Sequence, residues 1–410
     1  MKNMKIAMPS APAVRPGQWS DRYGWRRFGL GGVLFLAVLP RVFAADPTSG
    51  RVVAWGGNAN NLTNVPAGLT DITAVAAGAV HNLALKREGT VVAWGYSGHD
   101  ETNVPAGLNQ VVAIAASGYL ANGYDHNLAL KRDGTVVTWG SPDTVPDIFK
   151  PVGLSNVAAI ATGPAHSMAL LSNQTVVVWG ASASLTAVPP DLTNAVAIAA
   201  GGFHCLALRK NGTVTAWGSN SAGQTNVPAG LNNVMAVAAG NLHSLALQSN
   251  GTVIAWGNNY FGQTNVPAGL TNVIAISASG NEYGNHNLAL KSDGTLVEWG
   301  QVFNGPVSGF YETPPGDLSN VVSVAVGSSD SLAVTAGLTI KSVGIASQGP
   351  TLRFHTFSGR QYAVEFSSLP ATNGWTNLPG GGFSGSGYDL VVTDTNAAGM
   401  PCRFYRVRQN

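Results

Sequence analysis

Short apolar segments alternate with polar turns along residues 51–335, and the same pattern occurs seven times. Each unit contains a segment of the type HNLAL, whose His and Leu residues face one side of a strand. A Trp-Gly pair ends the next apolar segment, and the seven Trp residues follow at intervals of 39, 45, 40, 38, 39 and 43 residues. A period near 40 residues indicates a repeat architecture in which neighbouring units stabilise one another.

Each unit divides into four short segments. The first has the form VAVAAG, the second HNLALK and the third TVVAWG, and a D-G or N-G turn joins the second to the third. Such turns supply the positive φ angles of tight hairpins. The fourth segment, TNVPAG, contains a proline, which restricts it to an edge strand. Four antiparallel strands in about 40 residues predict one blade of a β-propeller.

The two ends of the array complete each other. The array begins at Arg51 with RVVAWG, which lacks its HNLAL partner, and ends at Ser331 with SLAV, which lacks a following VVAWG. We predict that these halves pair in one blade and close an all-β, seven-bladed propeller without free edges.

The repeated Trp, His and Gly residues have structural interpretations. Each Trp is expected to pack against an adjoining blade, and the Gly after it to permit a turn or a close backbone approach. Equivalent His residues in adjacent blades would lie roughly 9–10 Å apart, too far to share one metal. We therefore expect each imidazole to bond backbone in its own blade, and we predict no metal and no cofactor. The residues at this position are His81, His126, His166, His204, His243, His286 and Asp330.

Residues 1–45 have the pattern of an export signal. Basic residues precede the apolar run Phe28–Leu39, and small residues follow it at Ala44 and Ala45. The run has 12 residues, which is short for a bilayer span. A general secretory signal is our prediction, while an uncleaved anchor and twin-arginine export stay open as alternatives. No second apolar segment of membrane length follows, so we expect no transmembrane span after signal removal.

Composition and charge narrow the class of protein. With 51 Gly and 10% charged residues among 410, the chain has the composition of a turn-rich all-β protein. Residues 51–334 carry 9 basic and 15 acidic side chains, which argues against a nucleic-acid partner. Cys205 and Cys402 are too few for a disulfide framework, and Cys205 is expected in the core. We assign residues 46–336 to the propeller and 337–410 to a small C-terminal β-sandwich.

The unit GxxHxLALKxDGTVVAWGxNxxGQTNVPAGL resembles the repeat of the regulator-of-chromosome-condensation family, over about residues 51–335. This resemblance implies a seven-bladed propeller. The family's eukaryotic founder acts on a small nuclear GTPase, a role against which the export signal argues. The bacterial subgroup includes secreted inhibitors of β-lactamases. The C-terminal module resembles a short β-sandwich found on secreted bacterial proteins. No contact residue can be transferred, because the loops differ.

Sequence variation is concentrated on one face of the predicted propeller. Loops between strands one and two, and after strand three, fall on this face, and they carry the insertions Ser117–His126 and Ser279–His286. Rigid aromatic side chains with polar neighbours are typical of protein-binding hot spots, although some could instead cap the blades. The predicted binding residues are Tyr96, Tyr119, Tyr124, Asp125, Phe203, Tyr260, Phe261, Glu282, Tyr283, Phe303, Phe310 and Tyr311.

These features favour a secreted, periplasmic or cell-surface binding protein without catalytic activity. We expect a monomer that binds an extracellular or periplasmic protein, or a glycan. A propeller lyase or hydrolase is the alternative, with candidate acid–base groups on the same loops. A β-lactamase-type inhibitor is the third possibility. The acid–base candidates are His99, Asp100, Glu101, Asp125 and Glu282.

Overall fold

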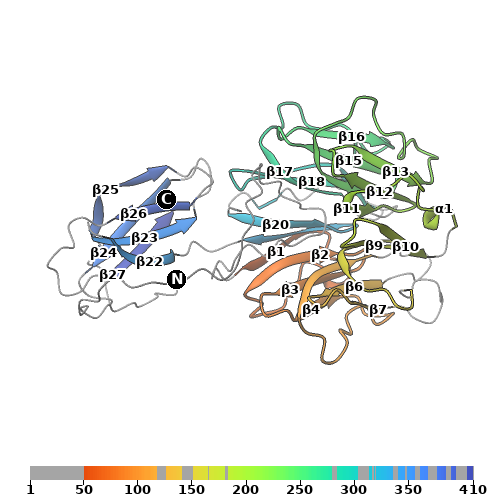
Figure 1. Ribbon diagram of the computed structural model, residues 1–410. Helices are drawn as coiled ribbons and strands as arrows, with labels where there is room; N and C mark the ends of the chain where they lie inside the picture. The colour runs from red at the N-terminus through yellow and green to blue at the C-terminus, as the bar shows by residue number, and fades with distance from the viewer. Residues whose placement is uncertain are drawn as a thin grey trace, which may run out of the picture. The chain divides into compact units, whose positions relative to one another are not determined.

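The computed structural model shows an all-β chain (Figure 1). Its described residues form two compact units that separate after Gly337. The predicted export signal, residues 1–45, lies outside the described residues. The structure describes residues 50–117, 126–140, 151–164, 166–180, 183–278, 284–302, 314–315, 318, 320–335, 340–346, 349–355, 361–367, 376–384, 389–393 and 404–409.

The larger unit is a ring of seven three-stranded antiparallel sheets, which confirms the predicted propeller. Six sheets are continuous in sequence, and each runs from an inner to an outer strand. These blades are β2 (Ile72–Ala77), β3 (His81–Lys86) and β4 (Val91–Gly95); β5 (Val111–Ala116), β6 (His126–Lys131) and β7 (Val136–Gly140); β8 (Val157–Gly163), β9 (His166–Leu171) and β10 (Val176–Gly180); β11 (Ala195–Ala200), β12 (His204–Arg209) and β13 (Val214–Gly218); β14 (Val234–Ala239), β15 (His243–Gln248) and β16 (Val253–Gly257); and β17 (Val273–Ala278), β18 (Gly284–Lys291) and β19 (Leu296–Val302).

The seventh blade joins the two ends of the array, as predicted. Its inner strands are β20 (Val321–Val326) and β21 (Asp330–Thr335), and its outer strand is β1 (Arg51–Gly56). The register runs from Arg51 opposite Thr335 to Gly56 opposite Asp330. Each inner strand contacts the next around the full circle, and β2 contacts β20. The ring is therefore closed by strand pairing between segments about 280 residues apart.

Within the described residues, the prediction of a fourth strand per blade is wrong, because each sheet of the ring has three strands. The segment that contains Val65 and Leu69 forms turns, in which the N–H of Leu69 donates to the carbonyl of Pro66 at 3.3 Å. Proline lacks the N–H that a ladder needs, so this segment closes on itself instead of extending the sheet. Val65 and Leu69 still pack on the apolar core, so the segment covers its blade as a turn.

The repeated Trp residues pack each blade against its neighbour, as predicted. Trp217, for example, packs in one cluster with Met168 and Leu170 of the preceding blade and with Ile198 of its own. Each indole N–H with a described carbonyl partner reaches the loop after the preceding blade. The donors Trp94, Trp139, Trp217, Trp256 and Trp299 bond the carbonyls of Leu62, Glu101, Leu185, Gln224 and Gln263 at 2.8–3.1 Å.

The glycine after each Trp meets the expected steric requirement. Gly95 has a φ of +114°, and a Cβ there would lie 2.6 Å from the carbonyl oxygen of Val80. Both the dihedral angle and the contact exclude a side chain. The outer strand therefore ends at a position where two loops come into backbone contact.

The smaller unit contains two three-stranded antiparallel sheets. One has the order β22 (Ile340–Ala346), β23 (Gly349–His355) and β26 (Asp389–Thr393). The other has the order β25 (Thr376–Ser384), β24 (Gln361–Ser367) and β27 (Phe404–Gln409). Each sheet contributes buried apolar side chains, as a small sandwich requires: Leu352, Val364, Leu378 and Val392. Across both units, the described part of the chain contains no helix that is long and apolar enough to cross a membrane.

Candidate protein-binding loop face

The two faces of the propeller differ in charge. The hairpins between strands two and three carry charged side chains such as Arg87, Glu88, Lys131 and Asp133. In the loops of the opposite face that the structure describes, Asp100 is exposed and Glu101 is buried, and these are their only carboxylates. We call this opposite side the loop face; it consists of the loops between strands one and two and of the residues that directly follow strand three, before the proline turns.

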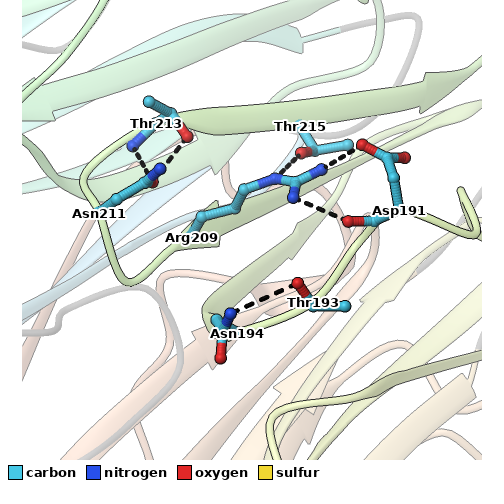
Figure 2. Close-up of polar contacts among 7 residues, drawn as sticks. All are labelled: Asp191, Thr193, Asn194, Arg209, Asn211, Thr213 and Thr215. Atoms are coloured by element: carbon cyan, nitrogen blue, oxygen red, sulfur yellow. Dashed lines mark hydrogen bonds and ion pairs between the residues drawn. The ribbon is translucent and has the colours of Figure 1, made fainter.

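Polar groups on the hairpin face are satisfied within the blade (Figure 2). Arg209 donates from Nε to Thr215 at 2.7 Å and from its two terminal nitrogens to the carbonyl and the carboxylate of Asp191, each at 2.8 Å. Asn211 accepts both the N–H and the hydroxyl of Thr213, which closes the hairpin turn. These contacts stabilise the blade and leave the charged groups of this turn engaged with one another.

On the loop face, the loops after β4, β13 and β16 share one framework. In each, a buried side chain accepts the backbone N–H two residues before it: Gln224 accepts Ala222, Gln263 accepts Phe261 and Glu101 accepts His99, at 2.8–2.9 Å. The carbonyl of the same residue accepts the Trp indole of the next blade. The framework therefore fixes each loop to two blades.

This framework changes the role of Glu101, which the sequence suggested as an acid–base candidate. Its side chain is fully buried, with one oxygen on the N–H of His99 and the other 3.3 Å from His99 Nδ1. Because Glu101 occupies the position of Gln224 and Gln263, it braces the loop as those amides do. Asp100 also serves the loop, since its carboxylate accepts the side-chain amide of Asn103.

The loop after β16 presents the most exposed aromatic residue of the described loop face. The Tyr260 side chain is 82% exposed and meets the Phe261 ring edge to face, with centroids 4.8 Å apart. Asn258 accepts the N–H of Tyr260 at 2.8 Å and the side-chain amide of Gln263 at 3.0 Å. Phe261 is half-buried. The loop therefore holds a projecting phenol ring on a backbone that is already fixed.

Tyr96 and Phe203 are also on this face, in loops of other blades. Tyr96 is 43% exposed and contacts His99 edge to face at 6.2 Å between centroids. It follows β4, whose blade lies three blades around the ring from that of β16, in the order β4, β1, β19, β16. Phe203 is 40% exposed and lies in the short loop between β11 and β12. The structure thus shows separate aromatic sites and no single aromatic cluster among these residues.

The other predicted binding residues fall outside the described residues, so their placement stays a prediction. They are Tyr119, Tyr124, Asp125, Glu282, Tyr283, Phe303, Phe310 and Tyr311.

The repeated His residues form a belt that joins adjacent blades, and the expectation of bonds within the same blade is wrong. His81 Nε2 lies 2.6 Å from the side-chain oxygen Oδ1 of Asn127, and His243 Nε2 lies 2.7 Å from Oδ1 of Asn287. An amide oxygen only accepts, so each imidazole donates from Nε2. Each of these His side chains points from the second strand of its blade toward the next blade. There its hydrogen-bond partner is the residue that directly follows the equivalent His or Asp. The remaining pairs are His126–Ser167, His166–Cys205, His204–Ser244, His286–Ser331 and Asp330–Asn82.

Burial keeps this belt uncharged. Desolvation lowers the pKa of His166, His204 and His286 to about 3 and that of His243 to about 4. The pKa of the Cys205 thiol is raised by burial. Within the described residues, no three His, Cys, Asp or Glu side chains gather as a metal-ligand group. The imidazoles of the belt therefore form neutral hydrogen bonds between blades.

A small cavity lies at the axis on the loop face. It has a volume of about 80 Å³ and is lined by the ends of the inner strands, including Gly78, Ser117, Thr162 and Gly327. At about 30 Å³ per water, it holds roughly two or three waters. The exposed aromatic residues lie outside this cavity, so the candidate binding surface is the outer loops.

Sequence comparison matches part of the propeller to one repeat family. Four segments match the regulator of chromosome condensation (RCC1) repeat: residues 72–100, 111–143, 195–224 and 235–263. The chain carries RCC1 repeats. The four segments lie in the blades that begin with β2, β5, β11 and β14. No curated protein matches the sequence.

Solved RCC1-type propellers resemble the fold. Prp20p from Saccharomyces cerevisiae, described with its binding to Gsp1p and histones, is 18% identical with a TM-score of 0.58, covering 74% of this chain and 94% of Prp20p. Yeast RCC1 (Prp20) bound to Kap60 is 18% identical with a TM-score of 0.57, and the match covers 79% of this chain and 97% of that chain. Human WBSCR16 is 17% identical with a TM-score of 0.51, and the match covers 70% of this chain and 98% of that chain. At these identities the similarity establishes the fold of the RCC1 propeller.

A recurring backbone conformation before the inner strands also had a signal in the sequence. The residue before each inner strand has a positive φ, between 53° and 60°, and its carbonyl can then accept an N–H from the hairpin, as Asn194 accepts Lys210 at 2.9 Å. Asn adopts this left-handed conformation more readily than most residues. Asn occurs at this place in five of the seven units, and this recurrence was the available signal. The seven residues are Asp71, Gln110, Asn156, Asn194, Asn233, Asn272 and Asn320.

Proposed function

We propose that this protein is a non-catalytic binding protein that acts outside the cytoplasm and captures a protein partner with the loop face of its propeller. The observation that carries the proposal is the loop after β16, where Tyr260 is 82% exposed on a hydrogen-bonded framework. A rigid aromatic side chain offers a large contact area, and little conformational entropy is lost when it binds. The RCC1-type relative Prp20p is described with protein partners, which supports a propeller used as a binding scaffold.

The preceding blade supplies an internal comparison. The loop after β13 has the same bonds, with Ala222 donating to Gln224 and Thr225 donating to Asn220, as Phe261 donates to Gln263 and Thr264 to Asn259. At the two positions occupied by Tyr260 and Phe261, that loop has Ser221 and Ala222. The aromatic pair is therefore not required by the loop framework, which favours a role in recognition.

The low charge of the loop face bears on the partner. Because its described loops carry a single exposed carboxylate, long-range steering by opposite charge contributes little to association. We infer that binding rests on aromatic contact and neutral hydrogen bonds. A protein surface with apolar pockets fits this chemistry, and the affinity should change little with salt.

The experiment places a photo-crosslinking amino acid at Tyr260, and in a second variant at Asn211 on the hairpin face. Each protein is incubated with the native extracellular fraction, and the adduct is identified by mass spectrometry. We expect one saturable protein adduct at position 260, which excess unlabelled protein removes, and none at 211. Equal adducts at both positions would refute the face assignment, and binding only to purified glycans would replace the protein partner.

A further inference from the structure

The blade that closes the ring is fastened differently from the others. In five junctions, the Trp indole donates to a main-chain carbonyl, which cannot change its charge. At the closing junction, Trp55 Nε1 instead donates to the carboxyl oxygen Oε2 of Glu298 at 3.0 Å. Residues at the position of Glu298 in the other units are Ala54, Ala93, Thr138, Val178, Ala216 and Ala255.

Glu298 connects both ends of the array. It belongs to β19, whereas Trp55 lies on β1 and Ser331 on β21, the two paired strands of the closing blade. The other oxygen of Glu298, Oε1, accepts the hydroxyl of Ser331 at 2.9 Å and lies 3.2 Å from His286 Nε2. The Glu298 side chain is only 5% exposed, so its charge state is set inside the seam.

We propose that Glu298 is a proton-controlled latch of the ring: its protonated carboxyl holds β1 in the closing blade, and its ionisation makes the release of β1 easier. A proton on Oε1 has an acceptor in His286 Nε2, and Oε2 remains free to accept the Trp55 indole. After ionisation, the carboxylate keeps only two neutral donors and a neutral imidazole in a buried site. An uncompensated buried charge disfavours the closed state, while an opened seam gives that charge to water.

The direction of the pH effect follows from the burial of Glu298. Desolvation raises its pKa to about 7 in the closed ring, and a solvated glutamate in an opened seam has a pKa near 4.5. The latch is therefore strongest below pH 4.5. Opening should become at most about tenfold easier for each pH unit below about 7 and only about twofold easier further above it.

Other titratable groups at the seam must be separated from this effect. His286 on β18 has a pKa near 3, so it favours opening as the pH falls below its ordinary value of 6.5. Asp330 on β21 has a pKa raised to about 7 by burial and bonds Asn82 of the next blade. Arg51 lies exposed at the far end of β1, and the strands β17 and β20 contain no titratable residue. A comparison of the wild type with a Glu298 variant cancels these shared contributions.

The experiment measures amide hydrogen exchange in the full-length protein between pH 5 and 9, corrected for the intrinsic exchange rate. The Glu298→Gln variant keeps an acceptor for Trp55 but does not titrate. The ratio of β1 protection in the wild type to that in the variant should fall about fortyfold from pH 5 to 7, and only about twofold further above pH 7. Strand β4 is the internal control, because its Trp94 bonds the carbonyl of Leu62.

Two outcomes would overturn the latch. One is a ratio for β1 that does not change with pH, and the other is an equal change in β4, which would indicate global unfolding. Glu298→Ala, which installs the residue of four other units, provides a second folded variant with the same expected loss of pH dependence. Carbon-13 NMR of the Glu298 carboxyl gives an independent readout, since a midpoint near 4.5 would also contradict the proposal.

Discussion

Replacing Trp256 tests whether the repeated Trp is the main fastener between blades. Its side chain is 7% exposed and packs with Leu206 and Leu208 of the preceding blade. Its indole N–H donates to the carbonyl of Gln224 at 2.9 Å. Truncation of a buried Trp to Ala costs about 3–5 kcal/mol, because apolar contact is lost and a cavity remains. We expect Trp256→Ala to lower the free energy of unfolding by that amount, measured by urea titration with circular dichroism.

Trp256→Phe separates packing from hydrogen bonding. It keeps most of the buried ring and removes one N–H donor, and the Gln224 carbonyl still accepts the Ser244 hydroxyl at 2.9 Å. Its cost should therefore be about 1–2 kcal/mol, mainly from one hydrogen bond and a small loss of contact. Tyr260→Ala, at an exposed site, should stay within about 0.5 kcal/mol. The reasoning is refuted if Trp256→Ala costs less than about 1 kcal/mol, or if the Phe variant is as unstable as the Ala variant.

Three further predictions concern the backbone, the His belt and the buried thiol. Gly95→Ala should destabilise by at least about 3 kcal/mol in urea titrations, because its Cβ would lie 2.6 Å from a carbonyl, while Gly107→Ala, with no atom within 4 Å, should cost about 1 kcal/mol. Burial lowers the pKa of His166 from 6.5 to about 3, so between these pH values the unfolded state binds more protons than the folded His belt. Because the belt imidazoles outnumber the two buried carboxyls, calorimetry should show a Tm that falls as the pH decreases below 6.5. A constant Tm would contradict the neutral imidazoles. Cys205 should react with a thiol reagent only after unfolding, since it is fully buried, and fast labelling of the native protein at this residue would contradict its position.

The sequence was sufficient for the architecture because the repeat states each local rule several times. The D-G and N-G hairpins, the Trp-Gly strand ends and the split array could each be compared across units, and the structure has them as expected. Comparison could not decide how proline segments fold, since an edge strand and a turn both fit TNVPAG. The missing N–H decided in favour of the turn.

The partners of the His residues were beyond sequence reasoning for a geometric reason. Strand alternation predicts which way a side chain points, but not which atom of a neighbouring blade lies within hydrogen-bond distance. The position after His contains Asn, Ser or Cys, and these residues look unremarkable until His81 and Asn127 are brought together. The same limit applies to Glu298, whose partner Trp55 is 243 residues away.

The binding role of the aromatic loops stays a prediction, and their arrangement could not be read from the sequence. Among the described residues, Tyr96, Phe203 and Tyr260 lie on the loop face, and Tyr260 is strongly exposed. Glu101 could not be recognised as a loop brace without seeing that it takes the place of Gln224 and Gln263. Separation of Tyr96 from Tyr260 follows from blade order, which spreads equivalent loops around the ring instead of gathering them.

The most direct test of the binding proposal is the affinity of the double variant Tyr260→Ser/Phe261→Ala for the protein identified by crosslinking. This variant installs the residues of the loop after β13, so its framework should stay intact. A matched control changes Lys210→Ser on the hairpin face. We predict that the double variant loses at least about a hundredfold in affinity, equal to about 2.7 kcal/mol, with an unchanged Tm, whereas the control binds as the wild type does. Unchanged affinity in the double variant would contradict the proposal.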